Sequence, residues 1–160
     1  MKKYFGILLS IILLTLSVPV YAEENSETSY PMIFEEEGSE IDSLFEDVEE
    51  NVMPRSQYIS TVLTSAKYLG SNKVAIHVDA YCNSVVKSIT SAFYLQKYTS
   101  SGWVNVSSGT ISVSNSNKLS KTGTVSGVPS GTYRAKSITR VMDNYGYAET
   151  LTSYSGAFSF

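Results

Sequence analysis

The single histidine of the chain, His77, stands two residues before Asp79, and this pair is the first candidate for chemistry. In an extended strand, residues i and i+2 point to the same face, so the carboxylate can orient the imidazole as a general base. A hydrolase also needs a nucleophile, and no serine stands in a Gly-x-Ser-x-Gly frame. We interpret the pair as neighbours on an exposed strand face and expect no enzymatic activity.

The single cysteine, Cys82, excludes an intramolecular disulfide, and the chain offers no His-paired or Cys-based metal site. Its place in an alternating run predicts a buried thiol rather than a reactive one. The carboxylates of residues 35–50 lack the spacing of a calcium-binding loop, and residues 143–146 suit a turn. We predict no metal and no cofactor.

Cations on one predicted strand are the stronger candidate for function. Arg134, Lys136 and Arg140 share one parity, so they project from one side of that strand. If the strand of residues 88–98 is its neighbour, a binding face results that consists of Tyr94, Lys97, Tyr98, Arg134, Lys136 and Arg140. Tyr and Arg dominate binding patches. The alternative is a solvated face whose cations keep the sheet soluble.

Alternation of apolar and polar residues supplies the elements that position these side chains. From residue 58 onward the period is two, and turn residues separate short predicted strands at residues 73–82, 88–98, 103–107, 110–113, 119–125, 132–141 and 147–154. This pattern, with no helical period between the strands, predicts an all-β domain. We expect an antiparallel β-sandwich of seven or eight strands, with a closed barrel as the alternative.

Residues 127–135, Gly-Val-Pro-Ser-Gly-Thr-Tyr-Arg-Ala, resemble the entry to strand F of immunoglobulin-like and fibronectin-like sandwiches. The resemblance implies that Tyr133 closes a corner by hydrogen bonding back to the backbone. Cys82 stands where such domains carry their first half-cystine, and Ala135 stands where the second would be. Trp103 lies later than the usual core tryptophan, so the resemblance covers the sandwich and no particular immunoglobulin family.

Residues 1–22 have the three parts of a signal peptide: Lys2 and Lys3, an apolar run over residues 5–16, and the sequence Val20-Tyr21-Ala22. The apolar run is shorter than the ~20 residues that span a bilayer. We therefore predict a secreted protein with no stable membrane span after signal cleavage. We also expect no nucleic-acid partner, although the basic domain would permit one on charge alone.

Charge divides the rest of the chain. Residues 23–53 hold 12 of the 15 acidic groups and no basic group, whereas residues 54–160 carry a net charge of +7. We predict that residues 23–55 are a disordered acidic linker. The alternative is a docking segment or pro-segment that lies on the basic domain (residues 56–160) until a cut near Arg55. A short helix at residues 39–51 would align Ile41, Leu44, Phe45 and Val48.

A second resemblance covers nearly the whole chain. It rests on the order of a signal peptide, an acidic spacer and the motifs Met53-Pro54-Arg55-Ser56, Tyr94-Leu95-Gln96-Lys97-Tyr98, Gly102-Trp103-Val104, Gly131-Thr132-Tyr133-Arg134-Ala135 and Leu151-Thr152-Ser153-Tyr154-Ser155. The chain is similar to small exported Gram-positive (Firmicutes) proteins classed as a domain of unknown function. That resemblance implies that the protein is exported and that it has the same fold, and it implies no activity.

These observations predict a secreted, non-enzymatic and monomeric binding module. Its ligand is unknown, and a cell-wall polymer, a glycan or a protein would each suit the Tyr/Lys/Arg face. The alternative is a secreted effector or bacteriocin-like protein that the acidic N-terminal segment restrains.

Overall fold

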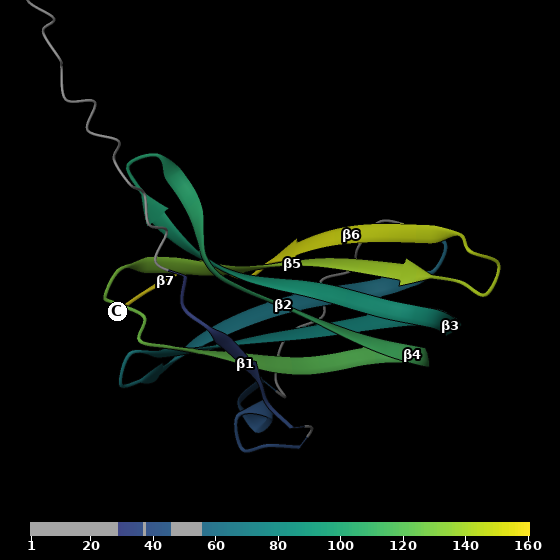
Figure 1. Cartoon of the computed structure of the whole chain (residues 1–160), viewed down its shortest axis with the longest axis horizontal. Coiled ribbons are helices and arrows are strands. Elements are labelled where there is room, and N and C mark those ends of the chain that lie inside the picture. The colour runs from purple at the N-terminus through teal and green to yellow at the C-terminus, as the bar shows by residue number, and fades with distance from the viewer. Residues whose placement is uncertain (1–28, 37, 46–55) are drawn as a thin grey trace, which may run out of the picture.

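A computed structural model of the chain describes residues 29–36, 38–45 and 56–160. In chain order its elements are β1 (Met32–Phe34), the 3-10 helix η1 (Asp42–Phe45), β2 (Ile59–Gly70), β3 (Lys73–Thr99), β4 (Gly102–Ser126), β5 (Thr132–Met142), β6 (Ala148–Tyr154) and β7 (Phe158–Ser159). Every strand pairing is antiparallel (Figure 1). The predicted all-β, antiparallel fold is confirmed.

Two layers share one long hairpin, formed by β3 and β4. The first part of β3 pairs with β2 up to Cys82, whereas its second part pairs with β5 from Ser88 onward. The β3–β4 ladder has a register shift between Tyr81 and Val86, at the place where the hairpin passes from one layer to the other. One layer therefore contains β2 and β1, and the other contains β5, β6 and β7. The result is an immunoglobulin-like β-sandwich.

The predicted strand boundaries inside this hairpin are wrong. Residues 73–82 and 88–98 belong to one strand, β3, and the three predicted strands between residues 103 and 125 are one strand, β4. Asn115 adopts a positive φ of 52°, yet the chain does not reverse there. The polar run of residues 114–117 is a local irregularity within a continuing strand, which turn-forming residue types alone do not distinguish from a turn.

The other predicted turns are present. Ser71 and Asn72 both have positive φ, at 49° and 59°, as the two-residue hairpin between β2 and β3 requires. Residues 143–147 connect β5 to β6, and Asp143 Oδ1 accepts hydrogen bonds of 2.8 Å from the backbone N–H groups of Tyr145 and Tyr147. That carboxylate serves the turn, as predicted.

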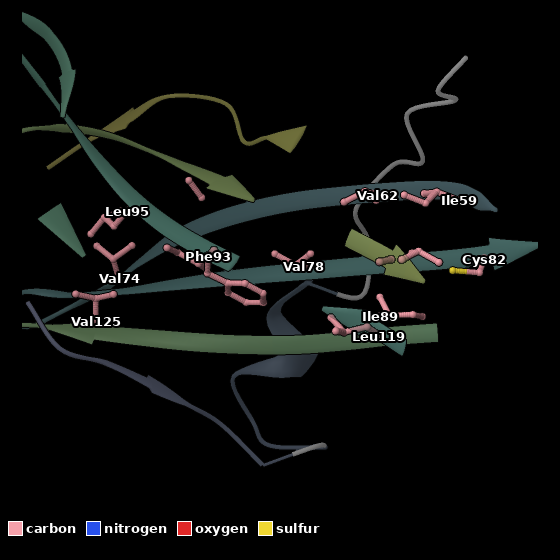
Figure 2. Close-up of a cluster of buried hydrophobic side chains, with 14 of the residues drawn as sticks. Ile59, Val62, Val74, Val78, Cys82, Ile89, Phe93, Leu95, Leu119 and Val125 are labelled. Atoms are coloured by element: carbon pink, nitrogen blue, oxygen red, sulfur yellow. The ribbon is translucent and has the colours of Figure 1, made fainter. Parts of the chain in front are cut away.

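Aliphatic side chains from both layers form one core. Figure 2 shows members of this core from β2, β3 and β4, and the buried set comprises Ile59, Val62, Val74, Ile76, Val78, Ala80, Cys82, Val86, Ile89, Phe93, Leu95, Leu119, Val125, Val128, Tyr133, Ala135 and Val141. The hydroxyls of Thr64 and Ser137 meet across the layers at 2.6 Å. The predicted inward parity of residues 74–82 is confirmed.

Tyr133 closes the corner before β5. Its ring is fully buried, and its hydroxyl donates a 2.6 Å hydrogen bond to the carbonyl oxygen of Pro129. Phe160 stacks on Tyr133 and Tyr68, and the backbone groups of Phe160 and Gly131 bond reciprocally. The resemblance-based expectation for Tyr133 is confirmed, and the corner fixes the start of the strand that carries Arg134.

Part of the acidic segment belongs to the sandwich. β1 adds to the edge of β4, and η1 lies next to it (Figure 1). Phe45 is 7% exposed and its ring stacks on His77, with 5.2 Å between centroids. Of the predicted helix at residues 39–51, the structure describes the 3-10 turn of η1 up to Phe45. Residues 46–51, like the predicted signal peptide at residues 1–22, lie outside the described residues.

Replacing Tyr133 with Phe should destabilise the sandwich. The substitution keeps the ring and removes the hydroxyl, so the Pro129 carbonyl loses its donor in a partly buried place. We expect a loss of about 1–2 kcal/mol in the free energy of unfolding, measured by urea denaturation as a lower midpoint with an unchanged slope. Tyr145→Phe is the matched control, because that side chain is 88% exposed. Equal midpoints for the two variants would contradict the role of the corner.

Candidate functional site

Five of the six residues predicted to form a binding face share the outward side of the second layer. They are Tyr94 and Tyr98 on β3, and Arg134, Lys136 and Arg140 on β5. The two strands are neighbours, and Tyr94 lies directly opposite Lys136. The predicted adjacency of these strands is therefore confirmed, and alternation along each strand places the five side chains on one face.

Lys97 is the exception. It pairs with Tyr133, and its Nζ lies 5.8 Å from the centroid of that buried ring. Because successive strand residues point to opposite sides, Lys97 faces away from Tyr94 and Tyr98. The prediction that Lys97 contributes to the binding face is wrong, and its ammonium instead covers the end of the core beside the tyrosine corner.

The centre of the face is Arg134, held between two aromatic rings. Its guanidinium carbon lies 4.4 Å from the ring centroid of Trp103 and 4.5 Å from that of Tyr154. Trp103 comes from the start of β4 and Tyr154 from the end of β6, so this aromatic clamp joins strands on both sides of Arg134. Cation–π contacts of this kind contribute about 0.5–2 kcal/mol each.

Two hydrogen-bonded side-chain amides also hold the guanidinium of Arg134 in place. Arg134 Nε donates a 2.8 Å hydrogen bond to Gln96 Oε1, and Gln96 Nε2 donates one of equal length to Asn105 Oδ1. Gln96 is buried, with 7% of its surface exposed. Two rings and a buried amide therefore hold the guanidinium and its Nε, and its two Nη groups remain to donate hydrogen bonds. Among the described residues, no carboxylate forms an ion pair with Arg134.

Further cations and rings surround this centre. Lys136 Nζ lies 5.6 Å from the ring centroid of Tyr94, and Arg140 is exposed. Tyr98 packs against Trp103 with 5.1 Å between centroids, yet 58% of its surface stays exposed, as does 49% of Tyr154. We call the set Tyr94, Tyr98, Trp103, Arg134, Lys136, Arg140 and Tyr154 the arginine–aromatic face.

The three carboxylates of residues 56–160 are engaged elsewhere. Asp79 binds His77, whereas Asp143 and Glu149 hold the beginning of β2 against the β5–β6 hairpin. Asp143 Oδ2 accepts from the Tyr58 hydroxyl at 3.0 Å, and Glu149 Oε2 accepts from the backbone N–H of Tyr58 at 2.9 Å. The positive charge of the arginine–aromatic face therefore has no partner among these three groups.

These bonds set the acidity of the two carboxyls. Burial by itself would raise the pKa of Asp143 and that of Glu149. The hydrogen bonds that each carboxylate accepts outweigh burial, so both pKa values lie below the ordinary ones. The ionised forms of both groups are thus favoured by the folded state.

His77 is buried and Asp79 is half-buried, so the predicted exposed location of this pair is wrong. His77 is 7% exposed because Phe45 covers it, a contact that a strand pattern does not reveal. Its Nε2 lies 3.0 Å from Asp79 Oδ2, and its Nδ1 lies 2.8 Å from the hydroxyl of Thr122, which is itself buried. A hydroxyl, an imidazole and a carboxylate stand in line, but a substrate has no access to them under Phe45.

Cys82 is buried, as predicted, with 7% of its surface exposed. Burial, followed by the negative charge of Glu149, raises the pKa of its thiol to about 11. The thiol therefore stays protonated at neutral pH and is a poor nucleophile.

Sequence reasoning missed the residues that hold Arg134 in place. Trp103, Gln96 and Asn105 come from the β3–β4 hairpin, and Tyr154 comes from β6. The turn at residues 143–146 was recognised, but Met142 pairs with Ala148 and not with Tyr147, so counting back from the predicted turn would have placed Ser153 and not Tyr154 opposite Lys136. Trp103 pairs with Tyr98 next to the turn between β3 and β4, and so lies on the same side as Tyr98 and Arg134; the register shift after Leu95 lies beyond this pair.

No three His, Cys, Asp or Glu side chains gather closely enough to hold a metal ion in residues 29–36, 38–45 and 56–160. In the same ranges, no helix has both the length and the apolar character to cross a membrane. The absence of a cofactor stays a prediction from composition.

No protein-family model matches the chain, and no curated protein matches it. Solved structures align with it at low similarity. The collagen-binding subdomain of the Enterococcus faecalis surface protein ACE is 11% identical with a TM-score of 0.41, over 62% of this chain and 96% of that one. The GAE domain of GGA2p from Saccharomyces cerevisiae is 12% identical with a TM-score of 0.35, over 70% and 97%. Likenesses at this level carry no functional argument.

Stability should fall as the solution becomes acidic. Because the folded-state pKa values of Asp143 and Glu149 are depressed, their contribution is complete above the ordinary carboxyl pKa of about 4. This contribution to stability is lost as the pH falls through the folded-state pKa values of the two carboxyls. Denaturation from pH 6 to pH 3 should give a steep decline in the free energy of unfolding for the wild type, and a shallower decline from a lower starting point for Glu149→Gln. Parallel profiles would contradict this linkage.

Proposed function

We propose that the protein is a secreted, non-enzymatic binding module that recognises an anionic extracellular ligand through the arginine–aromatic face. The observation that carries this proposal is the clamped guanidinium of Arg134, which two rings and an amide hold in place and which pairs with no carboxylate of residues 29–36, 38–45 and 56–160. A structural arginine usually forms an ion pair with an acidic neighbour, whereas the Nη groups of Arg134 remain available to bind a partner from outside.

The rigidity of Arg134 favours binding. A free arginine side chain loses rotamer freedom when it meets a ligand, which costs about 0.5–1.5 kcal/mol. The aromatic clamp has already removed that freedom in the folded protein. The planar guanidinium can then form paired hydrogen bonds to a carboxylate, phosphate or sulfate group, since each offers two oxygens at matching distance.

The surroundings extend this single contact into a surface. Lys136 and Arg140 follow Arg134 along β5, so cations recur at positions i, i+2 and i+6 on the same side. The exposed rings of Tyr98 and Tyr154 add contact area at low entropic cost. A linear polymer with repeated negative charges fits such a row better than a small anion does, and a cell-wall polymer, an acidic glycan and an acidic protein share this chemistry.

Export supports the same function. The signal-like residues 1–22 direct the chain to the outside, where such polymers are found and nucleic acid is not the expected partner. The engaged carboxylates, the covered histidine and the protonated Cys82 thiol offer no reactive group at the arginine–aromatic face. We therefore propose binding without catalysis, by a monomer.

Substitution of the arginines should abolish binding to polyanions. We expect Arg134→Ala with Arg140→Ala to weaken the affinity for dextran sulfate at least roughly tenfold, as the loss of charge-assisted hydrogen bonds implies. Uncharged dextran should not bind either protein. Lys67→Ala with Lys73→Ala is the matched control, because it removes the same charge from exposed positions on β2 and β3. Isothermal titration at two salt concentrations measures these differences, and equal affinities for both double variants would refute the face as the site.

The alternative function, a secreted effector restrained by the acidic segment, draws support from Phe45. That ring lies on His77 and covers this histidine on the outer side of the first layer. If this cover restrains an activity, Phe45→Ser should increase leakage of dye from anionic lipid vesicles relative to the wild type. Leu44→Ser is the control, because Leu44 is 44% exposed. Equal leakage with both variants would argue against restraint.

A further inference from the structure

A groove on the edge of β4 receives residues 30–34 of the same chain. Phe34, Ile33 and Met32 pair with residues 123–125 in the second half of β4. The backbone N–H of Tyr30 donates a 2.9 Å hydrogen bond to the carbonyl of Val106, the extra residue in the first half of β4. The segment therefore bridges both halves of the strand, and with them both layers of the sandwich.

Two glycines make room for this segment. A Cβ on Gly109 would lie 3.0 Å from Met32 Sδ and from the ring of Phe34, and a Cβ on Gly123 would lie 2.8 Å from Met32 Sδ. Both glycines have ordinary φ angles, so backbone conformation does not require them. They serve instead as space for two large apolar side chains. At the end of this space Phe34 meets the core residue Phe93 edge to face, at 5.2 Å between centroids.

The contacts of the segment are of a general kind. Backbone hydrogen bonds recognise any extended chain, and the groove selects large apolar side chains at two positions, i and i+2. The residue between them, Ile33, is 66% exposed and contributes no selectivity. The groove therefore has the properties of a peptide site that uses strand addition, occupied here by the chain itself.

We propose that this β4 groove is a strand-acceptor site for a partner protein. The partner supplies an extended segment with large apolar side chains at i and i+2, which replaces residues 30–34. The internal segment competes at the high effective concentration that a tether provides. Its ladder pairs end at Gly123, and the last backbone bond beyond them runs from Glu35 N–H to the carbonyl of Thr122, so a segment that continues along β4 gains ladder bonds that β1 does not form. This site is separate from the arginine–aromatic face.

The test uses the full chain with its groove vacated by Met32→Ser and Phe34→Ser. A fluorescent peptide of residues 29–36 is titrated into the wild-type and vacated proteins, and binding is followed by anisotropy. The vacated protein should bind the peptide at least roughly tenfold more tightly than the wild type, in which the internal segment competes. A peptide with serine at the Met and Phe positions should not bind, and adding Gly123→Val to the vacated protein should abolish binding by filling the groove.

Three results would overturn the proposal. One is a folded vacated protein that binds the native and the serine peptide equally. Another applies if the vacated protein is unfolded. The native peptide should then restore its β-sheet circular dichroism and raise its Tm. Failure to do so would show that residues 30–34 are needed only within their own chain. Dimers of the vacated protein without peptide would identify a second copy as the occupant, and would also contradict a separate partner. Arg134→Ala should leave peptide binding unchanged, so this test and that of the proposed function fail independently.

Discussion

The structure depends on one constraint: β3 and β4 remain hydrogen-bonded to each other while they pass from one layer of the sandwich to the other. Such a hairpin must bend where the layers meet, and it does so at the register shift between Tyr81 and Val86. Each layer is then completed on its own side, by β2 and β1 in the first and by β5, β6 and β7 in the second. Because both layers share the same two strands, the core between them is closed without a disulfide.

The arginine–aromatic face follows from this arrangement. β3 is central in the second layer, and the strands beside it bring together residues that are far apart in the chain. Trp103, Arg134 and Tyr154 meet because β4, β3, β5 and β6 lie in that order, and because the tyrosine corner at Tyr133 sets where β5 begins. The rigidity of the clamped guanidinium is thus a consequence of strand register. An isolated strand with the same residues would present a flexible arginine.

The N-terminal segment shows which kinds of contact position an acidic stretch of chain. Composition suggests that residues 23–53 are attracted to the basic domain by their negative charge. The contacts of residues 29–36 and 38–45 include a short backbone ladder, two apolar side chains against glycines, and one ring on an imidazole. Apolar burial and directional backbone bonds specify position, whereas attraction between solvated charges is screened within about 10 Å and specifies little.

The sequence by itself determined the fold class, the burial of Cys82 in its alternating strand, the turn at residues 143–146, and the parity of Arg134, Lys136 and Arg140. These features are local, because the period of two and the conformational preferences of Gly and Asn act over a few residues. The same alternation already separates Lys97 from Tyr94 and Tyr98. The tertiary structure decided which rings hold Arg134, that Phe45 covers His77, and that residues 114–117 continue a strand. Each of those outcomes depends on the register between distant segments, where a shift of one residue moves a side chain to the opposite face.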